Sequence, residues 1–291
     1  MSTFDNLKYK FQRFTIAEKL IVLNVLFFVI PFFLQTLFYL FNIPSTTFLS
    51  WFHLLPSFTE VLFRPWTLIT YSFLHGNFMH ILWNMILLYF VSRMYLNLFS
   101  EQQFLKNYLL GVLVGGLVFL IGYNLFPVFN GMYPPLVGAS AGVMAILIFV
   151  ATYTPDQEVR LLFINVKLQY IGIALVVVDI LLLQIPNGNA GGRLAHLGGA
   201  FLGFLYAKQL QKGNDIGSGL DRIWTFISSP FTEKKAQNMH TVHRSKTVSK
   251  KKTQNGQQQK IDAILDKIST SGYESLTQEE KDFLFRAGKD N

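Results

Sequence analysis

The chain of 291 residues is 51% apolar and only 14% charged, and it contains 29 phenylalanines and no cysteine. Because a typical soluble domain has about 25% charged residues, this composition argues against a disordered chain, an ordinary soluble enzyme and, despite the net charge of +8, a nucleic-acid-binding domain. It favours a protein embedded in lipid. The lack of cysteine excludes disulfides, thiolate zinc sites, iron–sulfur clusters and cysteine nucleophiles.

Six apolar stretches are long enough, or nearly long enough, to cross a bilayer as helices, which takes roughly 20 residues. The first follows four basic residues, but it is longer than a signal-peptide core and lacks a small-residue cleavage site, so we expect a retained helix. The pattern predicts an all-α membrane protein whose six-transmembrane-helix bundle occupies residues 1–212. The stretches are residues 20–42, 78–97, 104–126, 140–154, 168–186 and 193–211.

The lysines and arginines between these stretches predict an orientation. If the N-terminus is cytoplasmic, eight of them lie in inside segments, and only Arg64 and Arg193 lie outside. Cytoplasmic loops carry the excess of basic residues, so we expect the N- and C-termini in the cytoplasm. A six-span chain without a transit peptide is typical of a bacterial cytoplasmic (inner) membrane, and we expect an integral protein there.

Two segments differ from plain spans. Residues 43–77 form a long apolar first loop, which we expect to be embedded in the membrane interface. The stretch from Ser140 to Thr154 has 15 residues, or about 22 Å of helix, against a hydrocarbon core of about 30 Å. Its lead-in, Pro127 to Gly138, must then enter the membrane, where irregular backbone is tolerated only if protein shields it or it faces a water-filled cavity.

Polar residues gather at the outer ends of three spans that run in the same direction. His80 and Asn84 are four residues apart on one helical face, Ser140 opens the short span within Gly138–Gly142, and His196 lies one turn into the last span. Each has a plain explanation alone, because small residues pack helices and polar side chains bond neighbouring helices. Together, at one depth, they indicate a functional site.

These residue types suit peptide hydrolysis. A serine becomes nucleophilic when a base takes its proton, and His196 can do this for Ser140 if their two spans pack closely. Gly199 and Gly203 lie on the face of His196 and allow close packing, although ordinary helix packing would use the same glycines.

Acyl transfer also needs donors for the developing oxyanion. The amide of Ser140 lies at a helix start, where amides are unpaired, and the side chains of His80 and Asn84 can add two donors. Asp179 lies deep in the fifth span. We expect it to make a structural hydrogen bond rather than to orient His196, which leaves a Ser140–His196 dyad.

This combination resembles the rhomboid family of intramembrane serine proteases over residues 15–212. The resemblance implies Ser140 as nucleophile, His196 as general base and then acid, and His80, Asn84 and the Ser140 amide as oxyanion hole. It implies a rhomboid-like bundle that cleaves transmembrane protein substrates near the outer face of the lipid bilayer, without cofactor or metal. The matching motifs are His80-xxx-Asn84, Gly138-Ala139-Ser140-Ala141-Gly142 and Ala195-His196-Leu197-Gly198-Gly199-xxx-Gly203.

The first loop departs from the family pattern. Its motif is often Trp-Arg, whereas here Thr67 follows Trp66 and Arg64 stands just upstream, so the anchoring of the loop is in question. His75 matches another recurrent histidine of the family, and we expect a supporting role for it.

Two positions near the serine also depart from the family pattern. Ala141 stands where the family usually has glycine, and Met144 stands where a tyrosine often packs on the catalytic histidine. A thioether can still pack on imidazole. We therefore expect Met144 to support His196, as we expect Gly138, Gly199 and Gly203 to support the site.

Two other classes of function stay open. A catalytically silent rhomboid-like protein that only binds membrane proteins is expected to lack Ser140 or His196, and both are present. A transporter is expected to show internal repeats or charged residues along a path, whereas the polar residues here cluster on one side of the membrane.

The tail after residue 212 has a different composition. Residues 213–233 carry an apolar helical stripe and predict an amphipathic interfacial helix. Residues 234–258 predict a disordered basic linker, because seven basic and no acidic residues fall between Lys234 and Lys252. We expect it to act as a tether near anionic lipid headgroups and not to bind nucleic acid.

Residues 259–291 predict a short C-terminal helical hairpin. Gly272 ends the first helix, and a capping box at Thr277 and Glu280 opens the second. A piece of this size is too small to hold a core alone. We expect it to dock on another surface or to fold on a partner, and the sequence does not identify which.

Overall fold

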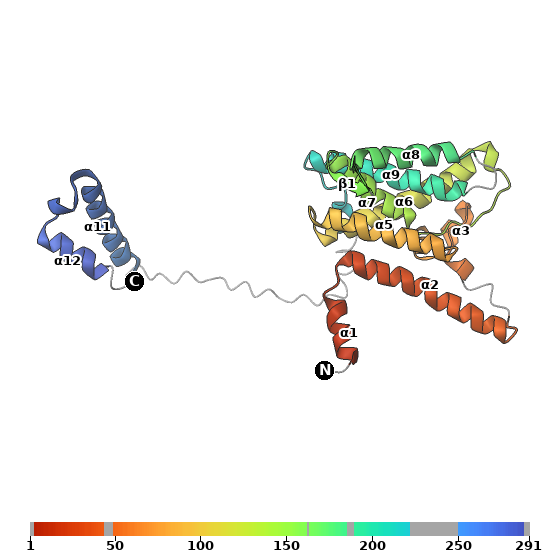
Figure 1. Cartoon of the computed structure of the whole chain (residues 1–291), viewed down its shortest axis with the longest axis horizontal. Coiled ribbons are helices and arrows are strands. Elements are labelled where there is room, and N and C mark those ends of the chain that lie inside the picture. The colour runs from red at the N-terminus through yellow and green to blue at the C-terminus, as the bar shows by residue number, and fades with distance from the viewer. Residues whose placement is uncertain (1–2, 44–48, 162, 185–188, 222–249, 288–291) are drawn as a thin grey trace. The chain divides into compact units, whose positions relative to one another are not determined.

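A computed structural model describes residues 3–43, 49–161, 163–184, 189–221 and 250–287. The chain divides into two compact units, Met1–Ile227 and Ser228–Asn291 (Figure 1). The first unit is the mostly helical body that carries the predicted site.

Each of the six predicted stretches forms a helix. Among the described residues, α2 and α6 are long and apolar enough to cross a membrane, and α5 forms a third candidate with the preceding segment Thr67–Phe73, from which it is bent by 96°. The protein is thus a mostly helical membrane protein, and α7 and α8 are shorter apolar helices. The helices are α2 (Ile16–Leu40), α5 (Phe78–Leu96), α6 (Glu101–Leu125), α7 (Ser140–Tyr153), α8 (Leu168–Leu182) and α9 (Ala190–Gln211).

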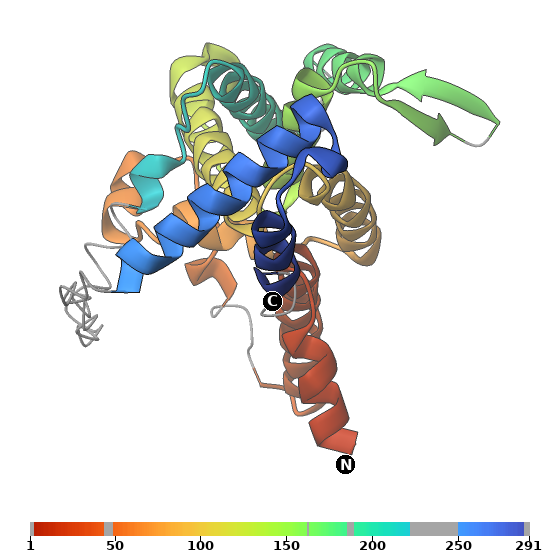
Figure 2. The ribbon, with the colours of Figure 1, turned by 90° about the vertical axis from the view of Figure 1, so that its left-hand side faces the viewer.

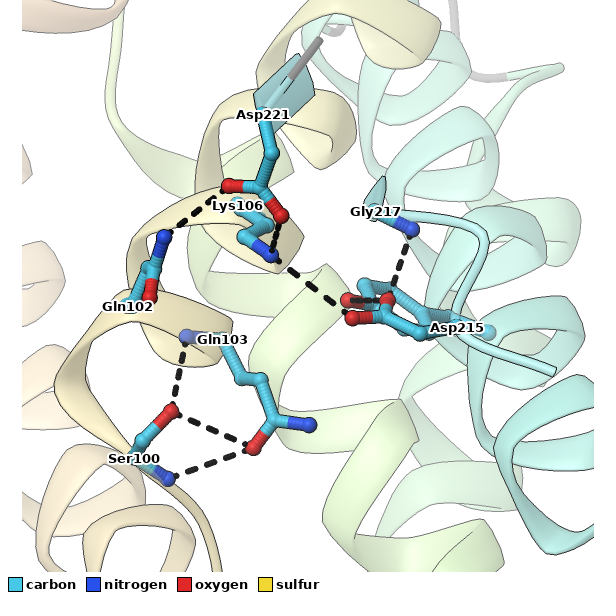
Figure 3. Close-up of polar contacts among 8 residues, drawn as sticks. Ser100, Gln102, Gln103, Lys106, Asp215, Gly217 and Asp221 are labelled. Atoms are coloured by element: carbon cyan, nitrogen blue, oxygen red, sulfur yellow. Dashed lines mark hydrogen bonds and ion pairs between the residues drawn. The ribbon is translucent and has the colours of Figure 1, made fainter. Parts of the chain in front are cut away.

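Capping residues fix where several helices begin. The Thr15 side chain accepts a bond from the Glu18 N–H, and Glu18 Oε2 accepts one from the Thr15 N–H at 2.8 Å, so α2 begins earlier than the predicted residue 20. Ser100 and Gln103 form the same capping box at the start of α6 (Figure 3). Each box satisfies backbone donors that a helix start otherwise leaves unpaired.

Helix α7 is the centre of the first unit. Eleven of its 14 residues are buried, and it contacts α5, α6, α8 and α9. A helix that is apolar on every side belongs in a protein interior. Figure 1 shows α7 lying between α5 and α8, both of which it contacts. The buried helix therefore holds Ser140 at its first residue, against several neighbouring helices.

The first loop is folded onto itself through short helices. The indole Nε1 of Trp66 donates to the Trp51 carbonyl at 3.0 Å, and the guanidinium of Arg64 lies 4.3 Å from the centre of the Trp51 ring. These contacts hold the loop together although it lacks the Trp-Arg motif, and the Asn124 amide in α6 bonds the loop at the Pro56 carbonyl, at 3.2 Å. Its elements are η1 (Leu49–Trp51), α3 (Phe58–Phe63), α4 (Thr67–Thr70) and η2 (Tyr71–Phe73).

The lead-in to α7 is shielded by this loop. After the short helix η3 (Pro127–Phe129), Leu136 exchanges two backbone hydrogen bonds with Leu54, at 2.8 and 3.3 Å, and the Gly138 N–H donates to the Tyr71 carbonyl at 3.0 Å. Protein groups thus pair the irregular backbone next to Ser140, as the short span predicts.

The sequence pattern does not predict the helix before α2 or the β-hairpin before α8. A ten-residue helix, α1 (Thr3–Gln12), precedes α2. An antiparallel hairpin, β1 (Glu158–Leu161) and β2 (Ile164–Lys167), joins α7 to α8, so the expectation of an all-α fold is wrong at this point (Figure 2). The strands are four residues each, and Val159 pairs with Val166. β-Branched residues favour strands. A strand of four residues is, however, too short for the alternation of apolar and polar residues to be recognised in the sequence.

The segment after α9 is held on α6 by a buried lysine. Lys106 is only 8% exposed and forms ion pairs with Asp215 and Asp221, and Gln102 also donates to Asp221 (Figure 3). The predicted amphipathic helix covers residues 213–233, of which 213–221 are described. A helical turn starts there at Ser218. The remaining residues of this predicted helix, and those of the predicted linker up to 249, lie outside the described residues.

The second unit contains the predicted helical hairpin, with α11 (Lys250–Ser271), η4 (Tyr273–Ser275) and α12 (Gln278–Ala287). Gly272, at a φ of 76°, follows the end of α11, and the Thr277 N–H donates to Glu280 Oε2 at 2.8 Å, as the capping box predicts. The predicted boundary at residue 259 is wrong, because α11 begins at Lys250. Its first turns are rich in lysine and glutamine, which are good helix formers.

Candidate active site

Glycines bring the backbones of α7 and α9 into direct contact. A Cβ atom on Gly199 would overlap the Ala141 carbonyl oxygen and lie 2.8 Å from its carbonyl carbon, and one on Gly203 would lie 3.0 Å from the carbonyl carbon of Ala145. From the first contact to the second, the chain advances by four residues in both helices, so α7 and α9 run in the same direction. Ser140 adjoins Ala141, and His196 lies one turn before Gly199, so both come to the same end of this contact.

Helix α6 closes the third side and accommodates Ala141. A Cβ on Gly115 would lie 2.5 Å from the Ala141 methyl and 2.8 Å from the Ala195 carbonyl oxygen. The methyl that departs from the family pattern thus fills space that Gly115 leaves open. Ala141 is fully buried there.

Gly138 places the imidazole of His80 beside Ser140. Its φ is +124°, which favours glycine, and a Cβ there would lie 2.7 Å from His80 Nε2 and 3.7 Å from Ser140 Oγ. The side chains of His80 and Ser140 therefore both border the same glycine, and any larger residue would push into the imidazole.

Hydrogen bonds at the start of α5 orient His80. Asn77 caps the helix by accepting from the His80 N–H at 2.8 Å, and the Asn84 amide donates to the His80 carbonyl at 2.9 Å. The Gly76 N–H points at His80 Nδ1 at 3.4 Å. A ring nitrogen that accepts leaves the proton on the other nitrogen. This arrangement therefore assigns the proton to Nε2, the nitrogen next to Gly138.

His196 contacts a buried carboxylate. Its Nδ1 lies 3.0 Å from Asp179 Oδ2, and the Arg193 guanidinium lies 3.4 Å from Asp179 Oδ1. The side chain of Asp179 is 9% exposed and that of His196 is 26% exposed. The sequence predicts a structural hydrogen bond for Asp179, and the structure shows that its partner is His196 itself. In the sequence, the one indication of this contact is the position of Asp179 along its span. That position does not determine which face of α8 packs against α9.

Ser140 stands at an uncapped helix start and is partly exposed. Ala139, the capping position of α7, makes no side-chain hydrogen bond to the first turn, so amides there stay unpaired and favour negative charge. Within the described residues, no hydrogen bond joins Ser140 Oγ to His196. Such contacts are often long without substrate and tighten in the reacting complex.

The remaining predicted residues lie nearby with different surroundings. The rings of His75 and His80 meet edge to face at 5.1 Å between centroids. Neither ring nitrogen of His75 has a hydrogen-bond partner in the described part of the chain. Met144, one turn after Ser140, is buried in the core at 7% exposure. Groups of three acidic or histidine side chains suited to a metal ion are absent from the described ranges.

Comparison with known proteins gives two family matches. Residues 62–212 match the Rhomboid domain, and residues 248–288 match a family of unknown function (DUF6576). The second match coincides with the helices of the C-terminal unit.

Two curated relatives show how far the similarity extends. RHOMBOID-like protein 12, mitochondrial, of Arabidopsis thaliana is 35% identical over 161 residues, covering 52% of this chain and 48% of the relative. Presenilin-associated rhomboid-like protein, mitochondrial, of Homo sapiens is 30% identical over 179 residues, covering 58% of this chain and 44% of the relative. The chain spans less than half the length of either. The Rhomboid match covers 151 of the 291 residues and includes α5 to α9, which form the site, so the chain belongs to the rhomboid family.

Proposed function

We propose that this protein is an intramembrane serine endopeptidase in which Ser140 attacks the substrate and His196 moves the proton. The observation that carries the proposal is the glycine-mediated contact of α7 with α9, which brings the start of α7 against Gly199, one turn after His196 in α9. His80, beside Gly138, supports it from a third helix.

Each residue has a chemical role in the proposed reaction. His196 Nε2 takes the proton of Ser140 as Oγ attacks the scissile carbonyl, and it then gives that proton to the leaving amine. Water next hydrolyses the acyl-enzyme with His196 again as base. The Ser140 amide, the Nε2–H of His80 and the Asn84 amide are donors for the oxyanion, a role that Asn84 takes with the N–H not bonded to the His80 carbonyl.

The substrate and the membrane follow from the same proposal. An active site at the start of a short, buried helix serves segments that enter from the bilayer, so transmembrane proteins are the proposed substrates and lipid is the surrounding partner. Six helices cross the membrane in this proposal, and the site lies near its outer face. The basic residues favour cytoplasmic N- and C-termini. The six-span pattern is the basis for proposing a bacterial cytoplasmic membrane. The mitochondrial location in the relatives' names belongs to those proteins.

The test is cleavage of a model transmembrane substrate in liposomes by the full chain. Wild type is expected to cut, and Ser140→Ala and His196→Ala are expected to lose cutting. Ser92→Ala is the matched control, because Ser92 lies in α5 and bonds the Tyr89 carbonyl, away from the site. Equal cutting by Ser140→Ala would overturn the nucleophile. Binding of substrates without any cutting by wild type would favour a silent membrane-protein binder.

A further inference from the structure

Asp179 is the one acidic residue that is buried among the described residues, with 7% of the whole residue exposed. Burying a charge is unfavourable unless partners compensate it. Asp179 has two such partners, and both come from the first two turns of α9. The neighbouring helix α8 thus presents a carboxylate to the helix that carries the proposed base.

The two carboxylate oxygens have different partners. Oδ2 lies 3.0 Å from His196 Nδ1, and Oδ1 lies 3.4 Å from Arg193 Nη1. Arg193 and His196 are three residues apart and share a helix face. Because an arginine only donates and an ionised carboxylate only accepts, Arg193 fixes which oxygen remains for His196.

This contact fixes the tautomer of His196. A bond to an acceptor requires the proton on Nδ1, and a neutral imidazole then carries its lone pair on Nε2. A general base for Ser140 needs that lone pair. We propose that Asp179 is a positioning residue, held by Arg193, which keeps His196 in the tautomer that can accept the serine proton. This inference rests on the proposed function, and it adds a third member to the predicted dyad.

The structure predicts what an asparagine would do at this position. In Asp179→Asn, Arg193 can bond only the amide oxygen, so the amide N–H₂ faces His196 Nδ1 and donates to it. The imidazole proton must then move to Nε2, where it blocks the base. A wrong tautomer of this kind lowers kcat by about 10⁴ in a serine protease with a Ser-His-Asp triad, and we expect a loss of about 100-fold or more here, with KM within about threefold.

Removing the arginine should relieve this block. In the double variant Asp179→Asn/Arg193→Gln, the amide can rotate and accept from Nδ1, so we expect kcat to recover about tenfold relative to Asp179→Asn. Loss of packing or of an ion pair alone would make the double variant worse. Asp156→Asn is the matched control, because its carboxylate is 77% exposed and bonds Lys167.

The experiment combines liposome cleavage with ¹⁵N spectra of full-length protein labelled in its histidine rings. The His196 signals are assigned by their absence in His196→Ala. We expect Nδ1 protonated in wild type and Nε2 protonated in Asp179→Asn. Cleavage by Asp179→Asn within about threefold of wild type, or an unchanged tautomer, overturns the inference. If that variant does not fold, an Nε2-protonated His196 in wild type overturns it. Ser140→Ala, run alongside, tests the proposed function separately.

Discussion

The contact between α7 and α9 predicts that Gly199→Ala lowers the rate of cleavage far more than Gly203→Ala does, although both variants lose a similar amount of stability. The added Cβ would lie 2.8 Å from the Ala141 carbonyl carbon, and ordinary contact begins at 3.4 Å, so the helices must separate by at least 0.6 Å. Ser140 and His196 flank this contact directly. A misplacement of about 1 Å can cost about 100-fold in rate, and we expect a loss of about 30-fold or more in kcat.

Gly203→Ala is the matched comparison one turn further along. Its Cβ would lie 3.0 Å from the Ala145 carbonyl carbon, so the required separation is at least 0.4 Å. Overpacking a core typically costs about 1–3 kcal/mol, and we expect both variants to be destabilised within this range. Because Gly203 lies a further turn from Ser140, its variant should lose much less activity than Gly199→Ala.

The assay measures liposome cleavage and thermal unfolding of the same preparations. Gly219→Ala serves as the neutral control, since among the described residues no atom beyond the backbone next to it lies within 4 Å of a Cβ placed there. Wild-type cleavage by a folded Gly199→Ala, or equal activity losses at positions 199 and 203, would refute the argument that this contact sets the geometry of the site.

Three other predictions follow from named contacts. Asn84→Ala should lower kcat about 100-fold or more with KM little changed, because one oxyanion donor is worth about 2.7–4 kcal/mol; a change confined to KM would count against it. Lys106→Met should release the segment after α9 and increase hydrogen exchange at residues 215–221, whereas equal protection would show that the ion pairs of Lys106 do not hold it. Hydrogen bonds from the Thr277 N–H and from Lys267 lower the pKa of Glu280 below 4.5, so the stability they give α12 is complete above that value and is lost as the pH falls through the lowered pKa. Hydrogen exchange of α12 that rises at low pH in wild type and not in Glu280→Gln is the expected result.

The sequence could predict the helices and the glycine contact because both depend on local patterns. The apolar run that starts at Ser140 ends before Pro155, and α7 has nearly these limits. Gly199 and Gly203 are spaced for one helical face, and the structure places that face against α7.

The contact between Asp179 and His196 could not be predicted in the same way. It depends on the rotation of α8 about its axis and on its height relative to α9, and neither is encoded in the spacing of residues along one helix. The same holds for Ala141, whose methyl is tolerated because Gly115 faces it from α6. From the sequence alone, Ala141 is a departure from the family pattern. The packing against Gly115 explains why its methyl group is tolerated.

The most direct test of the central claim is to identify the residue that a serine-reactive fluorophosphonate phosphonylates. The full-length protein in liposomes is treated with a fluorophosphonate, which reacts with activated serines, and the modified peptide is identified by mass spectrometry. We predict an adduct on Ser140 in wild type that is lost in His196→Ala. The adduct should be kept in His53→Ala, the control variant, because His53 lies in the first loop between η1 and α3. An adduct on another serine, or equal labelling of Ser140 without His196, would contradict the account.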